Sequence, residues 1–242
     1  MTGLRPLTFI LKGPTRNSNL GKGEGLLRFT VRAFVIASTI GFLFFSIGTP
    51  LFGGDENRGV IKAEEERVMK WRKERDQFFK THQRSPLTPE EKKRFKRLEY
   101  FPFNPSYYFE GAIERYILHI NDPKYYGTFL TNKGTNKRYI RYGKFHFLLN
   151  RQDHVIEVYK SILSDNLFVP FKDLTNGKET YEGGRYIDAA ILPGYQMVLD
   201  FNMAYYPSCA YNDKFTCAIP PKENFLEIQI RAGEKNRKGK KP

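Results

Sequence analysis

The run KRYIRYGKFHFLL (137–149), followed by HVIEVYKSIL (154–163), decides the fold that this sequence predicts. Both runs are rich in aromatic and β-branched residues and show a period of two, which is typical of strands. No long helical pattern separates them from six similar runs. We therefore predict an antiparallel, mainly β domain, built as a small barrel or a two-sheet sandwich. The further runs are residues 107–120, 124–130, 166–171, 185–191, 195–202 and 224–230.

The chain has 242 residues, enough for one sizeable domain with appendages at its ends. Apolar residues make up 40% of the sequence and aromatic residues 15%, so a substantial core can form. The formal net charge is +14, but much of this surplus lies in residues 1–32 and in the basic tail 235–242. The β domain itself has only a modest surplus, and no nucleic-acid partner is expected.

A stretch without any ionisable group, residues 33–54, indicates a membrane-spanning helix. Such a helix would cross the roughly 30 Å hydrocarbon core of a bilayer. Basic residues crowd the preceding tail, so we expect a single-pass inner-membrane protein with this tail in the cytoplasm and the C-terminal domain in the periplasm. The tail would also contact anionic lipid headgroups. The alternative is a cleaved signal peptide, because the small residues Ser46 and Gly48 suit a cleavage site.

The segment between the span and the strands, residues 55–98, predicts two helices. Thr88 can cap the second one, with Pro89 in its first turn and Glu91 completing a capping box, and this helix should end near Leu98. The first helix has apolar residues at heptad-like spacing. They would pack on the domain's own sheet or dock on a neighbouring membrane protein. These docking candidates are Ile61, Val68, Trp71 and Phe78.

The stretch FKDLTNGKETYEGGRYIDAA (171–190) contains the strongest candidate for a functional site. Its Asn176-Gly177 and Gly183-Gly184 pairs predict tight turns with positive φ. Turns alone do not explain the nearby acids and arginine, nor the sequence DFN (200–202) at the end of a later strand. These side chains could form either a buried ion-pair network or a ligand pocket. The ligand-binding candidates are Asp173, Arg185, Asp188, Asp200, Asn202 and Tyr206.

Cys209 and Cys217 are the only cysteines. On the predicted topology they lie outside the cytoplasm, where a pair so close in sequence favours a disulfide that would stabilise the fold by about 2–3 kcal/mol. Metal binding and free thiols are the alternatives. The histidines are dispersed and no spacing fits a zinc or EF-hand site, so neither a metal nor a cofactor is predicted. Catalytic sequence motifs are missing, which leaves no reason to name a reaction.

Several blocks of the sequence resemble the DUF1684 family of bacterial and archaeal proteins. They include WRKERDQFF (71–79), LFVPFKDLTNGKETYEGGRYID (167–188) and LDFNMAYYPSCAYNDKFTCAIPPKENFLEIQIRAGE (199–234). The resemblance extends over about residues 68–234 and implies no particular activity. Many members look secreted or membrane-anchored, which agrees with the predicted topology. The family pattern includes Asp173, Asn176, Gly177, Tyr181, Gly184, Arg185, Asp200, Asn202, Tyr206, Cys209 and Cys217.

Two functions are compatible with these features. The first is a non-catalytic accessory subunit, in which an extracytoplasmic β domain (99–234) is tethered by its span and helical stalk to a larger membrane assembly. The second is an extracytoplasmic enzyme or small-ligand-binding protein that uses the polar cluster at the sheet end. The expected partners are therefore the membrane and other subunits of a membrane complex.

Overall fold

The computed structural model describes residues 54–162 and 165–236. These residues all belong to one compact unit of the chain, Pro50–Pro242. The predicted span (33–54) lies outside the described residues apart from Gly54, as does the basic tail before it. In the described ranges, no helix combines the length and the apolar character needed to cross a bilayer.

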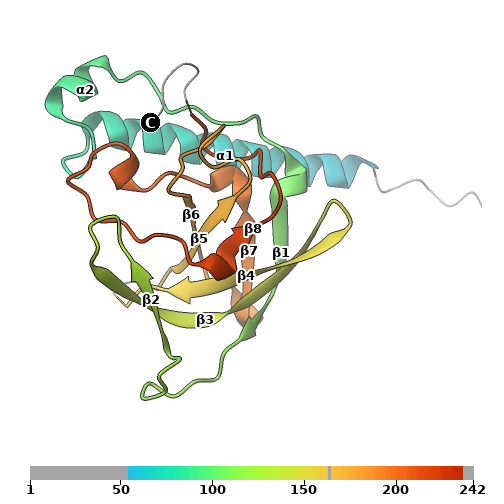
Figure 1. The fold of residues 1–242 in the computed structure, drawn as a ribbon. Coiled ribbons are helices and arrows are strands. Elements are labelled where there is room, and N and C mark those ends of the chain that lie inside the picture. Colours follow the sequence, from blue (N-terminus) through green and yellow to red (C-terminus); the bar gives the residue numbers. More distant parts are fainter. Residues whose placement is uncertain (1–53, 163–164, 237–242) are drawn as a thin grey trace, which may run out of the picture. The chain divides into compact units, whose positions relative to one another are not determined.

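Two helices precede the strands, as predicted, and the first lies across one end of the sheet (Figure 1). Among the described residues there are also five short 3-10 helices, of which one directly precedes the first strand and four lie in the connections between strands. The α-helices are α1 (Gly54–Thr81) and α2 (Pro89–Arg94). The 3-10 helices are η1 (Pro105–Tyr107), η2 (Pro193–Tyr195), η3 (Phe201–Met203), η4 (Ser208–Ala210) and η5 (Lys222–Asn224).

Helix α2 begins where predicted because Thr88 and Glu91 form a capping box. The Thr88 hydroxyl accepts a hydrogen bond from the Glu91 N–H at 3.3 Å, and the Glu91 carboxylate accepts one from the Thr88 N–H at 2.8 Å. The helix ends at Arg94, short of the predicted Leu98. The Leu98 N–H instead donates to Asp76 of α1 at 2.8 Å, so a tertiary contact replaces the last helical turn.

Each of the eight predicted runs overlaps one strand. All pairings between strands are antiparallel except that of β8 with β5. The strands are β1 (Tyr108–Arg115), β2 (Tyr126–Leu130), β3 (Asn136–Leu149), β4 (Gln152–Lys160), β5 (Leu167–Asp173), β6 (Arg185–Ala189), β7 (Gln196–Asp200) and β8 (Phe225–Leu226).

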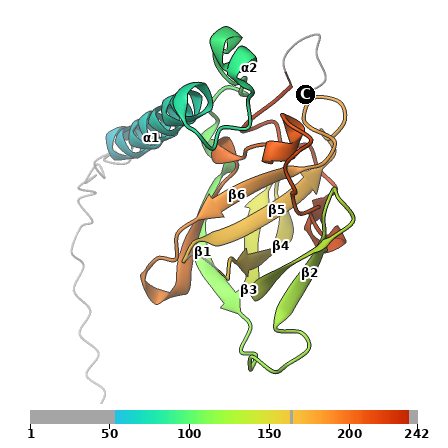
Figure 2. The same cartoon turned by 90° about the vertical axis from the view of Figure 1, so that its left-hand side faces the viewer.

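The strands form one eight-stranded sheet that curls as a half-barrel (Figures 1 and 2). Its order is β6-β5-β4-β3-β1-β7, with β2 added beside β3 and β8 beside β5. The mainly β, antiparallel class is therefore as predicted, and a single curled sheet is closer to the predicted barrel than to stacked sheets. The last run (224–230) was expected to be one full strand, but only its Phe225–Leu226 portion is a strand.

A bulge in β3 allows the sheet to bend around its core. The register with β4 shifts between Arg141 and Gly143, and β3 pairs with β2 before this point and with β1 after it. Glycine is needed here, because a Cβ would come within 2.5 Å of the Glu114 carbonyl oxygen. The bend encloses a core of large apolar side chains. They include Phe145, Ile156, Leu167, Phe171, Met197, Leu199 and Phe201.

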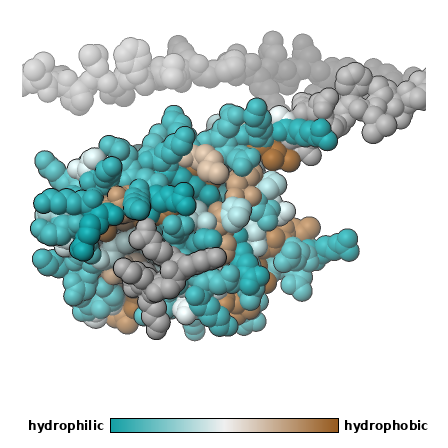
Figure 3. Space-filling view, turned by 90° about the horizontal axis from the view of Figure 1, so that it is seen from above, coloured by the Kyte–Doolittle hydropathy of each residue, from teal (hydrophilic) through white to brown (hydrophobic). Residues whose placement is uncertain are grey.

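The predicted apolar stripe of α1 divides between the core and the surface. Val68 is fully buried against the domain, and Trp71 contacts Tyr100 edge to face with ring centroids 6.3 Å apart. Ile61 and Phe78 are each 36% exposed. Phe78 stacks on His82, just after the helix. The face of the molecule seen from above is mostly hydrophilic, with hydrophobic residues scattered over it (Figure 3). Packing on the domain's own residues therefore applies to the middle of α1.

Candidate functional site

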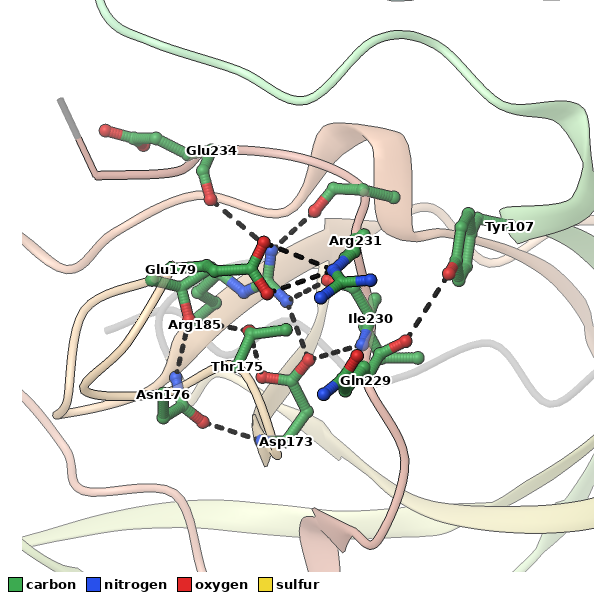
Figure 4. Close-up of polar contacts among 12 residues, drawn as sticks. Tyr107, Asp173, Thr175, Asn176, Glu179, Arg185, Gln229, Ile230, Arg231 and Glu234 are labelled. Atoms are coloured by element: carbon green, nitrogen blue, oxygen red, sulfur yellow. Dashed lines mark hydrogen bonds and ion pairs between the residues drawn. The ribbon is translucent and has the colours of Figure 1, made fainter. Parts of the chain in front are cut away.

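Arg185 and Asp173 form a buried ion pair where strands β5 and β6 meet. Both side chains are fully buried, and the Arg185 Nη2 lies 3.1 Å from the Asp173 Oδ2. The antiparallel register pairs Phe171 with Arg185, which brings the first residue of β6 beside the end of β5. The Thr175 hydroxyl donates to the other carboxylate oxygen at 2.7 Å. Figure 4 shows this carboxylate enclosed by its donors.

The remaining bonds of this ion pair go to the backbone of the C-terminal segment. The Ile230 N–H donates to Asp173 Oδ2 at 2.6 Å, and Arg185 donates to the carbonyls of Ile230 at 2.8 Å and Ala232 at 2.5 Å. Side chains, and not a neighbouring strand, thus bond the backbone at residues 230 and 232. The ion pair therefore holds the C-terminal segment, at residues 230 and 232, against the sheet.

The turn between β5 and β6 is built around Asn176. Its carbonyl oxygen accepts from the Asp173 N–H at 2.6 Å, and its amide donates to the Thr180 hydroxyl at 3.0 Å and the Tyr181 carbonyl at 2.7 Å. Gly177 follows with a φ of 76°, as the predicted turn requires. The polar residues of this stretch are therefore largely used to hold the turn.

Asp200 and Asn202 belong to a second network, at the end of β7. Asp200 Oδ1 accepts from both the backbone and the side-chain amide of Asn202 at 2.9 Å, and Oδ2 accepts from Arg67 at 2.7 Å. Asn202 also exchanges two hydrogen bonds of 2.9 Å with the backbone of Asn104. In the described part of the chain, no hydrogen bond joins these residues to Arg185, so the predicted single cluster is divided into two.

The buried Arg72 of α1 completes the second network, and sequence reasoning missed it. The sequence around it, KWRKER, is typical of a solvent-exposed helix face. Arg72 is nevertheless buried and donates to the carbonyls of Phe101 at 3.0 Å and Asn202 at 3.2 Å. Its guanidinium lies 4.5 Å from the centre of the Tyr100 ring. These contacts fix α1 across the end of the sheet.

Tyr206 contacts the C-terminal segment rather than the two networks. Its hydroxyl donates to the Asn236 side chain at 2.8 Å, and its N–H donates to Glu234 Oε2 at 3.0 Å. Arg75 of α1 reaches the same oxygen at 3.5 Å. Burial raises the pKa of Glu234 to about 7, because desolvation of the carboxylate outweighs the attraction of Arg75 and the hydrogen bond from the Tyr206 N–H.

Two of the sequence-predicted acids line a cleft of about 400 Å³ between α1 and strands β1, β6 and β7. Asp200 forms one wall with Arg67, which also bonds Glu64 at 2.7 Å. Asp188 is exposed and accepts a hydrogen bond from Tyr205 at 2.6 Å. The pKa of Asp200 is raised because burial outweighs its hydrogen bonds. The cleft is lined by three carboxylates, Glu64, Asp188 and Asp200, and by one arginine, so its lining has a net negative charge. Its apolar walls are Leu192, Val198 and Met203.

The two cysteines lie next to each other. The Cys209 N–H donates to the Cys217 Sγ at 3.2 Å. Both are free cysteines in the structure, so the disulfide stays a prediction. In the described residues, no group of three or more histidine, cysteine and acidic side chains is arranged to hold a metal ion.

Comparison with known proteins identifies relatives without assigning a reaction. The model of the family described as "Protein of unknown function (DUF1684)" matches residues 93–235. Among solved structures, the chain is similar to the solution NMR structure of an uncharacterized protein of Haloarcula marismortui. The two are 31% identical with a TM-score of 0.59, and the alignment covers 77% of this chain and 100% of that one. No curated protein matches the chain.

Proposed function

This chain belongs to the DUF1684 family, and from that premise we propose that it is a membrane-anchored, non-catalytic subunit of a larger membrane assembly. Residues 33–54 would be its span, with the N-terminal tail in the cytoplasm and the described domain in the periplasm. The domain would attach to the other subunits through apolar side chains that its own fold leaves uncovered. Its polar networks would serve to hold that fold together.

The observation that supports attachment is the loop between β1 and β2. This loop, residues 116–125, projects away from the sheet (Figures 1 and 2). Its Ile117 is 98% exposed and its Ile120 is 58% exposed. Burying such a side chain against a partner subunit would contribute about 1.5–3 kcal/mol to the free energy of binding.

Hydrogen bonds inside the loop order the part that contains Ile120. The Asp122 N–H donates to the His119 carbonyl at 2.8 Å, and the Lys124 N–H donates to the Asp122 carboxylate at 2.7 Å. The Asn121 N–H donates to the His119 ring at 3.2 Å. An ordered loop loses less conformational entropy when it docks, which favours binding.

The polar residues of the family pattern support a structural rather than a catalytic role. Asp173 and Arg185 are fully buried, and the bonds that they form go to other parts of the same chain. Asn202 is likewise buried against the backbone of residue 104. Groups enclosed in this way do not face a substrate. In the proposed accessory role, the surface of the domain binds the partner, and the two polar networks stabilise the fold.

The double variant Ile117→Asp, Ile120→Asp tests this proposal in the full chain. In native membranes solubilised with a mild detergent, the wild type is expected to migrate in a particle much larger than a monomer. The variant is expected to migrate as a monomer, because each lost apolar contact weakens docking by about tenfold or more. Native-size analysis gives the readout.

A matched double variant at two other exposed apolar positions, Leu130→Asp, Val155→Asp, controls for added charge. It should remain in the large particle. A monomeric wild type, or an Ile117→Asp, Ile120→Asp variant that stays in the large particle, contradicts the accessory role.

The cleft under α1 favours a second candidate function, the binding of a small ligand. Its negative surplus and apolar walls suit a ligand with a cationic head and an apolar body. Asp188 would contact the cation, because its carboxylate has no arginine or lysine partner among the described residues.

A thermal-shift series with n-alkylamines and n-alkyl carboxylates of equal length tests this candidate. The amines should raise the melting temperature of the wild type, and Asp188→Asn should abolish the rise while keeping an acceptor for the Tyr205 hydroxyl. Glu179→Gln, at an exposed acid outside the cleft lining, is the control and should respond as the wild type does. Equal responses to amines and carboxylates, or an unchanged response of Asp188→Asn, rule the candidate out.

A further inference from the structure

We propose that Cys209 and Cys217 form a redox-active dithiol, which thiol–disulfide exchange with a small disulfide such as glutathione disulfide converts reversibly into an intramolecular disulfide. This inference is independent of the accessory role. It also differs from the structural disulfide predicted from the sequence, because both the reduced and the oxidised state would be working states of the folded chain.

The folded chain brings the two sulfurs together before any bond forms. Cys209 lies in η4, and its N–H donates to the Cys217 Sγ at 3.2 Å. The chain between them is folded back by hydrogen bonds from the Asn212 N–H to the Ser208 carbonyl at 3.1 Å and from the Phe215 N–H to the Asn212 carbonyl at 3.2 Å. Oxidation therefore requires only a local adjustment.

Cys217 is the more firmly held member of the pair. Its N–H donates to the Asn132 side chain at 2.8 Å, and its carbonyl accepts from the Asn132 N–H at 3.1 Å. The next residue, Ala218, bridges Thr131 beside the end of β2. Cys209 is partly exposed, and Cys217 is buried with 9% of its surface accessible. The Cys209 sulfur lies beside the fixed Cys217 sulfur and is placed to resolve a mixed disulfide formed on it.

The hydrogen bonding also distinguishes the two sulfurs chemically. A hydrogen bond from the Cys209 thiol, helped by the Cys209 N–H and by Lys137, lowers the pKa of Cys217 to about 7, although burial opposes this. The same thiol–thiol bond and burial raise the pKa of Cys209. Cys217 is therefore the more acidic thiol of the pair. Other titratable groups facing the pair are Tyr139, Tyr181 and Tyr186.

The exchange balances in two steps. The Cys217 thiolate attacks one sulfur of glutathione disulfide, so a mixed disulfide forms and a glutathione thiolate leaves. Cys209 then loses its proton to water and attacks the Cys217 sulfur, which forms the Cys209–Cys217 bond and releases the second glutathione. The chain loses two electrons and glutathione disulfide gains them. Excess reduced glutathione reverses both steps.

Incubating the full chain with graded ratios of reduced to oxidised glutathione tests the proposal, with mass spectrometry after acid quenching. The wild type should convert between dithiol and disulfide within the graded series. Cys209→Ser should stop at a glutathione adduct on Cys217, and Cys217→Ser should form neither product. Alkylation at pH 7 should be about tenfold slower in Cys217→Ser than in Cys209→Ser, because the thiolate is lost.

Three results would overturn the proposal. The wild type could retain its disulfide in excess reduced glutathione, which identifies a static structural bond. It could form no disulfide in excess oxidised glutathione. Finally, the two serine variants could be alkylated at equal rates, in which case Cys217 is not the attacking thiolate. Each variant's far-UV circular dichroism, compared with the wild type, reports whether it is folded.

Discussion

Arg185→Ala is expected to lower the free energy of unfolding by about 3–5 kcal/mol, because it leaves the fully buried Asp173 carboxylate without its cation. The substitution also removes the donors to the carbonyls of Ile230 and Ala232, so the C-terminal segment loses its attachment to the sheet. A loss of this size is a large part of the stability of a typical domain. Urea unfolding followed by circular dichroism would measure it.

Arg231→Ala is the matched control for this prediction. Arg231 lies in the same segment and pairs with Glu179 at 3.0 Å, but the two side chains are 55% and 40% exposed. Exposed pairs contribute about 0–1 kcal/mol, so the control should unfold almost as the wild type does. If Arg185→Ala loses no more than Arg231→Ala, the buried pair is not what fastens the C-terminal segment.

The second large effect concerns pH and Glu234. Its pKa in the folded state is raised to about 7 from an ordinary value of 4.5, so between these values the folded state binds more protons than the unfolded state. The stability contributed by the protonated form is complete below about pH 4.5 and is lost as the pH rises through 7. The expected loss is about 3 kcal/mol, since one pKa unit corresponds to about 1.4 kcal/mol.

Glu234→Gln isolates this contribution, because glutamine stays neutral and retains an acceptor for the Tyr206 N–H. Between pH 5 and 8, the variant's unfolding free energy should fall less steeply with pH than that of the wild type. Glu179→Gln, at an exposed acid, should leave the wild-type slope unchanged. Parallel curves for the wild type and Glu234→Gln would show that this carboxylate is ionised throughout.

Local signals made much of the fold predictable from the sequence. The end of β3 alternates between buried and more exposed positions because one face of the sheet is buried there, and each of the eight runs overlaps a strand. The capping box at Thr88 and the turn at Asn176-Gly177 depend on atoms only a few residues apart. Such features are encoded where they occur, which is why both the start of α2 and the turn after β5 were predicted correctly.

Long-range contacts explain what the sequence did not reveal. Arg72 is buried because the carbonyl of Asn202, far along the chain, accepts its hydrogen bond, and no local pattern distinguishes it from a solvent-exposed helix arginine. The side chains of Asp173 and Arg185 bind the backbone of residues 230 and 232, a contact between distant parts of the chain that no local pattern shows. The candidate residues were identified, but their division into two networks depends on tertiary structure.

Carbene footprinting of the full chain tests the accessory role most directly, because it measures whether the loop 116–125 is covered in its native setting. Labelling would be compared between native membranes and chain purified in a detergent that dissociates assemblies. The account predicts that Ile117 and Ile120 are strongly protected in membranes and labelled after purification, while the exposed Val155 is labelled in both. Equal labelling of the two isoleucines in both states would contradict it.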